Sequence, residues 1–102
     1  MFTEKEIKEL ILKSIKRSED FLSDDSPQIA EAILIQLLKI NPDNFEAMQL
    51  LGLALYKQDK YKEAICIFEK SLKGNPNNAE NHNNIGLCYS SLHKFRKAIK
   101  HA

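Results

Sequence analysis

The chain has 102 residues, a length suited to one domain, and its 15 basic and 14 acidic side chains leave a formal net charge of +1. That balance argues against a general electrostatic role at nucleic acid or at a membrane surface. The two cysteines form no CxxC motif and no disulfide framework, which favours a cytoplasmic location. We expect no signal peptide and no membrane span, because the N-terminal residues are charged and every apolar run is short.

The first two predicted helices cover residues 3–21 and 29–40. Thr3 and Glu6 have the spacing of a capping box, in which each side chain bonds the backbone amide of the other residue. Apolar residues then recur every three or four positions, as a helix buried on one face requires. Ser26, which a proline follows, indicates the cap of the second helix.

Four more helices are predicted after this pair. Two of them cover residues 44–58 and 61–73 and are joined by a tight turn. Gly74 follows directly, and we expect it to adopt the left-handed conformation that often ends a helix. The fifth helix covers residues 78–92, and a sixth opens near Lys94. No segment alternates as a strand does, so the predicted fold class is all-α with six helices.

Small, helix-ending and aromatic residues recur in this sequence with a constant period of about 34 residues. The recurring positions are Pro42 and Pro76, Gly52 and Gly86, Tyr61 and Phe95, and Ala30, Ala64 and Ala98. A period of this length, with one helix pair in each period, is typical of a repeat solenoid. Glycine inside a helix costs about 1 kcal/mol relative to alanine, so its recurrence requires a packing reason. We therefore expect the two helices of a pair to cross closely at the glycine.

These residues resemble the tetratricopeptide repeat (TPR) family over nearly the whole chain. The second unit, about residues 45–78, matches at Leu51, Gly52, Tyr61, Ala64, Phe68, Leu72 and Pro76. The third, truncated unit, about residues 79–102, matches at Ile85, Gly86, Tyr89, Phe95 and Ala98. The degenerate first unit, about residues 3–42, matches only in its second helix and has Ser18 in place of the glycine. The resemblance implies one domain over residues 1–102, a right-handed superhelix of antiparallel helix pairs.

The resemblance also implies where a partner would bind. In similar proteins the first helix of each pair lines a concave face that holds an extended peptide or a helix of another protein. The concave-face residues that it implies here are Gln49, Leu53, Tyr56, Asn83, Asn84, Leu87 and Ser90. We therefore expect a non-catalytic scaffold for protein–protein interaction, with a protein or peptide as its partner.

Asn84 holds a position where co-chaperone repeats and O-linked N-acetylglucosamine transferase have a similar asparagine. In those families the amide grips a peptide backbone, because it both donates and accepts hydrogen bonds. The alternative for Asn84 is a solvated amide on the helix surface. The basic positions that clamp a terminal carboxylate in co-chaperones hold Ile15, Glu19, Leu50 and Glu80 here. Recognition of an acidic C-terminal tail is therefore rejected on charge complementarity.

No set of residues in this sequence predicts catalysis. Ser/His/Asp groupings, glycine-rich phosphate loops and paired buried carboxylates are all missing, so we predict no enzyme and no cofactor. His82 and Cys88 are six residues apart and point to different faces of a helix, so no metal site is predicted. A basic stripe remains near the C-terminus, which either contacts nucleic acid or an acidic partner or is a solvated face. Its members are Lys94, Arg96, Lys97, Lys100 and His101.

Two alternatives to partner binding stay open. The predicted sixth helix stops about halfway, so we expect a piece of a longer protein, and its open end exposes Leu87, Tyr89 and Ile99. One alternative is self-association, in which this end pairs with another copy or exchanges an element with it. A frayed, monomeric end is the simpler reading of the same residues. The other alternative is an N-terminal regulatory segment of a larger enzyme, such as a glycosyltransferase.

Overall fold

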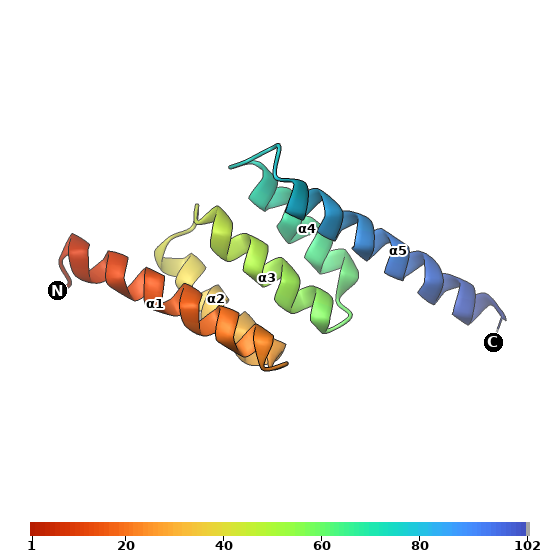
Figure 1. The fold of residues 1–102 in the computed structure, drawn as a ribbon, viewed down its shortest axis with the longest axis horizontal. Helices are drawn as coiled ribbons and strands as arrows, with labels where there is room; N and C mark the ends of the chain where they lie inside the picture. Colours follow the sequence, from red (N-terminus) through yellow and green to blue (C-terminus); the bar gives the residue numbers. More distant parts are fainter. Residues whose placement is uncertain (102) are drawn as a thin grey trace.

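The computed structural model describes residues 1–101, which form five α-helices stacked side by side (Figure 1). The helices are α1 (Glu4–Ser23), α2 (Pro27–Ile40), α3 (Phe45–Lys57), α4 (Tyr61–Leu72) and α5 (Ala79–His101). Successive helices run antiparallel, and the described part is elongated, with extents of 57 × 28 × 19 Å. No strand occurs in residues 1–101, so the predicted all-α class is confirmed. None of the described helices is both long and apolar enough to cross a membrane.

The predicted sixth helix is not separate, because α5 continues through the expected turn at residues 92–94. The two earlier turns each contain an aspartate in the left-handed conformation, Asp25 (φ 59°) and Asp59 (φ 62°), and the two aspartates stand one repeat period apart. Short Asx side chains tolerate this conformation better than most residues. His93 stands one period after Asp59, and good helix formers, Leu92 and Lys94, flank it. The backbone therefore stays helical there, and the count of six helices is wrong for residues 1–101.

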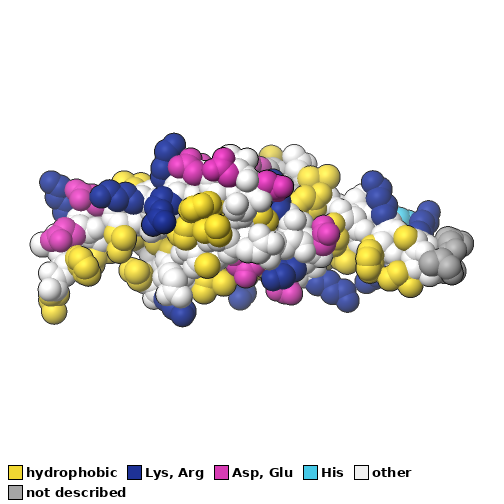
Figure 2. Space-filling model, turned by 90° about the horizontal axis from the view of Figure 1, so that it is seen from below, with side chains coloured by type: hydrophobic (Ala, Val, Ile, Leu, Met, Phe, Trp, Pro, Cys, Tyr) yellow, Lys and Arg dark blue, Asp and Glu magenta, His cyan; other side chains and the backbone are white. Residues whose placement is uncertain are grey.

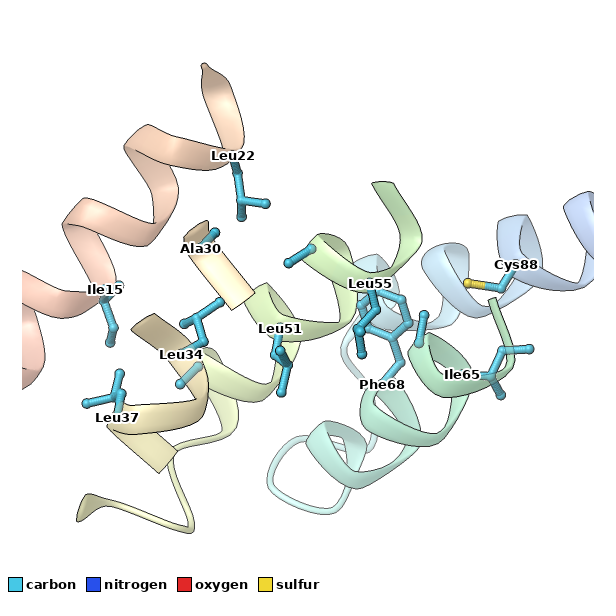
Figure 3. Close-up of a cluster of buried hydrophobic side chains, with 13 residues drawn as sticks. Ile15, Leu22, Ala30, Leu34, Leu37, Leu51, Leu55, Ile65, Phe68 and Cys88 are labelled. Atoms are coloured by element: carbon cyan, nitrogen blue, oxygen red, sulfur yellow. The ribbon is translucent and has the colours of Figure 1, made fainter. Parts of the chain in front are cut away.

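One apolar cluster runs along the stack and joins all five helices (Figure 3). Ile15 and Leu34 hold the first pair together, and Leu55 and Phe68 hold the second pair together. Cys88 extends the cluster into α5. Leu34 and Phe68 are fully buried and occupy equivalent positions, one period apart. The core of this protein is therefore a row of interfaces between neighbouring helices.

Two glycines are required by close approach of an aromatic ring. A Cβ atom at Gly52 would lie 2.5 Å from Cε1 of Phe68, so the α3–α4 crossing excludes a side chain there, as predicted. A Cβ atom at Gly74 would meet the ring of Phe45. The left-handed conformation predicted for Gly74 is wrong, since no described glycine has a positive φ. Gly74 is therefore explained by space and not by its backbone angles.

The first helix pair differs from the second at its crossing and at its caps. The capping box at Thr3 is confirmed, because Glu6 N donates to Thr3 Oγ1 over 3.1 Å and Thr3 N donates to Glu6 Oε1. Ser18 is buried where a glycine was expected, and its hydroxyl donates to Ser14 O over 2.8 Å. This bond within the helix satisfies the buried hydroxyl. Ser26 stands at the N-cap position of α2 and Pro27 in its first turn, as predicted, but the Ser26 side chain makes no cap hydrogen bond.

Candidate functional site

The seven residues predicted for the concave face lie on two helices that contact each other. Gln49, Leu53 and Tyr56 belong to α3, and Asn83, Asn84, Leu87 and Ser90 belong to the first half of α5. Asn83, Leu87 and Ser90 are exposed, whereas the other four side chains are half-buried. Leu87 is the most open apolar member, with 52% of its surface exposed. The candidate surface therefore combines exposed polar groups with partly covered apolar ones.

Gln49 is already engaged within the chain. Its Oε1 accepts a hydrogen bond from Nδ2 of Asn78 over 3.2 Å. Asn78 also caps α5, because its Oδ1 accepts from Asn81 N over 3.1 Å. Asn44 caps α3 in the same way, one period earlier, by accepting from Ala47 N over 2.9 Å. Gln49 thus fixes the linker that precedes α5, in addition to its predicted role at the surface.

A chain of three hydrogen-bonding groups positions α5 on the second helix pair. Asn81 Nδ2 donates to Ser71 Oγ over 2.9 Å, and Ser71 Oγ donates to Phe45 O over 2.7 Å. The Ser71 hydroxyl has one proton and donates it to Phe45 O, so its oxygen can only accept from Asn81. The amide nitrogen of Asn81, and not its oxygen, therefore faces Ser71. Asn81 is fully buried. These bonds join the start of α3, the end of α4 and the start of α5.

Sequence reasoning missed Asn81, although one signal was available. Asn81 stands one period after Ala47, and both are fully buried. A polar residue at a position where the preceding repeat buries alanine requires a hydrogen-bond partner. Ser71 provides that partner, at a position where the preceding repeat buries Leu37. The two polar departures from the repeat pattern therefore explain each other.

Asn84 is half-buried, and its amide nitrogen is not exposed at the candidate surface. Its Nδ2 is buried and has no hydrogen-bond partner among the described residues, and the same holds for Oδ1 of Asn81 one turn earlier. Leaving a buried donor unpaired costs about 1–3 kcal/mol. The hydrogen bond to a peptide backbone that the resemblance implies for Asn84 stays a prediction.

A groove of about 530 Å³ lies apart from the seven predicted residues. It lies between the start of α4 and the middle of α5, with Tyr61 on one side and Leu92 and Phe95 on the other. The Tyr61 hydroxyl donates to Asp59 Oδ1 over 2.7 Å, and this bond raises the pKa of Tyr61. The groove exists because α5 continues straight past residue 93. Since a turn was expected there, the sequence did not predict this groove.

Among the side chains that the structure describes, no three from His, Cys, Asp or Glu lie close enough together to hold a metal ion. His82 is committed elsewhere, since its Nε2 lies 2.8 Å from Pro76 O. Cys66 and Cys88 are both free thiols.

The predicted basic stripe lies on the second half of α5. Lys94, Arg96 and Lys97 are exposed there, whereas the side chains of Lys100 and His101 lie outside the described residues. The absence of a nucleic-acid partner stays a prediction, and so does the choice for this stripe between a solvated helix face and a contact.

The two thiols should react at very different rates. Cys66 is exposed, whereas Cys88 is buried and burial raises the pKa of its thiol, so less of the reactive thiolate forms. We expect a disulfide reagent such as 5,5′-dithiobis(2-nitrobenzoic acid) to label one thiol rapidly in the native chain and both thiols in denaturant. The Cys66→Ser variant should show no rapid phase. Two rapid thiols in the native wild type would contradict the burial of Cys88.

Stacked antiparallel helix pairs that recur with a constant period of this length define a TPR-type helical repeat protein. The family profile described as anaphase-promoting complex, cyclosome, subunit 3 matches residues 26–102, and the chain belongs to this family. Among solved structures, the chain is similar to the TPR domain of FLU from Arabidopsis, with a TM-score of 0.73 and 25% sequence identity. That match covers 92% of this chain and 89% of the other chain. No curated protein sequence matches the chain.

These matches confirm the predicted resemblance to TPR proteins and the predicted solenoid class. TPR-type folds generally mediate protein–protein interaction, and they are typically scaffolds without catalytic activity. The chain is therefore a TPR-type scaffold whose partners, as a class, are proteins. The limits predicted for the three repeat units stay a prediction.

Proposed function

We propose that the chain binds a peptide or a helix of a partner protein on the surface formed by α3 and the first half of α5, and that it acts without catalysis. The observation that supports this proposal is that Leu87 is exposed and that Leu53 and Tyr56 are only half-buried. Apolar side chains that remain open on a folded surface mark interaction sites. The family name, which refers to a subunit of a complex, also favours a protein partner.

The chemistry of this surface favours a neutral, partly apolar segment. None of its seven residues carries a charge, and Asn83, Asn84 and Ser90 supply donors and acceptors for a peptide backbone. The positions of a carboxylate clamp remain non-basic, with Ile15 buried, Leu50 half-buried, and Glu19 and Glu80 exposed. We therefore propose contact with apolar side chains and backbone groups, and not with an acidic tail.

Binding should depend on Leu87 and not on Ile29, an apolar residue of the same size on another helix. In the Leu87→Glu variant we expect affinity for a captured partner to fall at least about tenfold, or about 1.4 kcal/mol, because a charge would be desolvated in the contact. Ile29→Glu is the matched control, since Ile29 is exposed to a similar degree on α2. The partner would be captured with the wild-type chain, and its affinity for each variant measured by titration calorimetry.

Asn84→Ala completes this experiment by testing the hydrogen bond. We expect it to weaken binding without unfolding the chain, which circular dichroism would verify. If the wild type, Leu87→Glu and Asn84→Ala bound the partner with equal affinity, the proposed binding surface would be wrong. A loss with Ile29→Glu alone would move the contact to α2.

A second candidate function is self-association through α5, which we also propose. Tyr89, Phe95 and Ile99 are exposed large side chains on this one helix. Figure 2 shows hydrophobic side chains gathered at the surface toward the C-terminal end of the molecule.

A cytoplasmic location remains part of the proposal and is supported by the two free thiols. The role as a regulatory segment of a larger enzyme stays a prediction.

A further inference from the structure

A groove of about 360 Å³ lies between α1 and α2, on the side of this helix pair that faces away from α3. Glu31 marks the side of α2 that faces α3, because its carboxylate accepts a hydrogen bond from Gln58 of α3 over 2.8 Å. Ile40 lines the groove and stands about two and a half helical turns after Glu31, so it lies on the opposite side of α2. Figure 2 shows the molecule from this side, with hydrophobic side chains gathered among charged ones toward its N-terminal end.

The groove is open and free of charge. Its lining includes Leu10, Ser14, Ile33, Gln36 and Ile40, and none of its lining residues is charged. Leu10 and Ile40 keep 41% and 54% of their surfaces exposed. The second helix pair differs at two equivalent positions, one period later, which hold Met48 in place of Ser14 and Lys70 in place of Gln36. A short side chain therefore leaves space between α1 and α2, and an uncharged one borders that space.

Stacking of another repeat does not account for this apolar side. The α3 residues that pack on α2 are buried: Ala47, Leu51 and Ala54. Their equivalents on α1, one period earlier, are charged and exposed: Lys13, Arg17 and Asp20. A repeat that packed on α1 as α2 packs on α3 would have to bury these charges, which is costly. The groove beside them therefore suits an occupant of another kind.

The walls of the groove favour a helix as the occupant. Both walls are helices, whose backbone groups are bonded within each helix, and only Ser14 and Gln36 offer polar side-chain groups. An extended peptide in the groove would leave backbone N–H and C=O groups unpaired against isoleucine and leucine side chains. A helix satisfies its own backbone and needs only an apolar stripe to fill such a groove.

The charges at the rim favour acidic residues on that helix. Lys13 and Arg17 stand within one turn of Ser14, and Lys39 is adjacent to Ile40. All three basic side chains are exposed, and none forms an ion pair among the described side chains. The acidic residues Glu6 and Glu9 border a smaller hollow that adjoins the groove.

We propose that the α1–α2 groove binds one amphipathic helix of another protein. The apolar stripe of that helix covers Leu10, Ile33 and Ile40, and its acidic residues face Lys13 and Arg17. This groove shares no residue with the proposed surface on α3 and α5. One chain can therefore hold two protein segments at once, which extends its proposed role as a scaffold.

Two synthetic peptides test the charge preference. Each is a helix of about four turns with leucines along one face, and the flanking positions are glutamate in one peptide and lysine in the other. By fluorescence anisotropy, the acidic peptide should bind the wild type at least about fivefold more tightly than the basic peptide. The double variant Lys13→Glu with Arg17→Glu should reverse this order. The control Lys62→Glu with Lys70→Glu makes the same charge change at exposed positions of α4 and should not.

Ser14→Met tests the groove itself, because it introduces the residue that the second helix pair has at this position. It should weaken binding of the acidic peptide at least about tenfold by filling the groove, while circular dichroism shows an unchanged helix content. Leu87→Glu should leave the affinity for this peptide unchanged, so the outcome is independent of the proposed surface on α3 and α5.

The proposal would be overturned if neither peptide bound, if the two bound equally, or if Ser14→Met bound the acidic peptide as the wild type does. A wild-type dimer in sedimentation that Ser14→Met converts to a monomer, without any effect on peptide binding, would instead assign the groove to a second copy of the chain.

Discussion

Replacing Phe68 with alanine should lower the free energy of unfolding by about 3–5 kcal/mol. The ring is fully buried and fills the space over Gly52, so its removal leaves a cavity between α3 and α4. Domains of this kind have a total stability of about 5–15 kcal/mol, so the variant should be close to unfolded at physiological temperature. Urea denaturation followed by far-UV circular dichroism would measure the loss.

The matched control for this substitution is Phe2→Ala. Phe2 is largely exposed, and its truncation should change the free energy of unfolding by no more than about 0.5 kcal/mol. If Phe68→Ala and Phe2→Ala were equally mild, the second helix pair would not be packed as described.

Alanine at two glycines that occupy equivalent positions in successive repeats should have opposite effects on stability. Gly52→Ala places a Cβ atom 2.5 Å from the fully buried ring of Phe68, and overpacking of this kind costs about 1–3 kcal/mol. This cost exceeds the gain in helix propensity, so we expect a net loss of about 1–2 kcal/mol. Gly86→Ala meets no atom within 4 Å and should raise stability by about 0.5–1 kcal/mol.

Urea denaturation of both variants, at concentrations where the chain is monomeric, would measure the two effects. A loss at Gly86 similar to that at Gly52 would show that the third unit closes in solution as the second unit does. That result would also count against the straight α5.

Most of the fold could be predicted from the sequence, because its signals are local and repeated. Apolar spacing placed the helices, and the repeat period identified the residues of the α3–α4 interface, including Gly52, Ala64 and Phe68. The polar exceptions were harder to foresee. Asn81 and Ser71 had to be considered together, and they come from different helices.

The course of the chain at His93 could not be predicted in the same way. A turn there would bury Tyr89 and Ile99, but it requires a left-handed residue and breaks a continuous helix. The local terms in this balance are each about 1 kcal/mol, so composition alone does not decide between the two conformations. The groove beside Tyr61 depends on this one choice, and so it was missed as well.

The row-like core has a consequence for the way in which native structure is lost. Contacts join each helix mainly to its immediate neighbours, so α2, α3 and α4 are supported from both sides, whereas α1 and α5 are supported from one. Cooperative melting in such an array spreads from the ends toward the middle. The lifetime of the native chain is therefore set by the central pair, and the projecting half of α5 opens first at little cost to the rest.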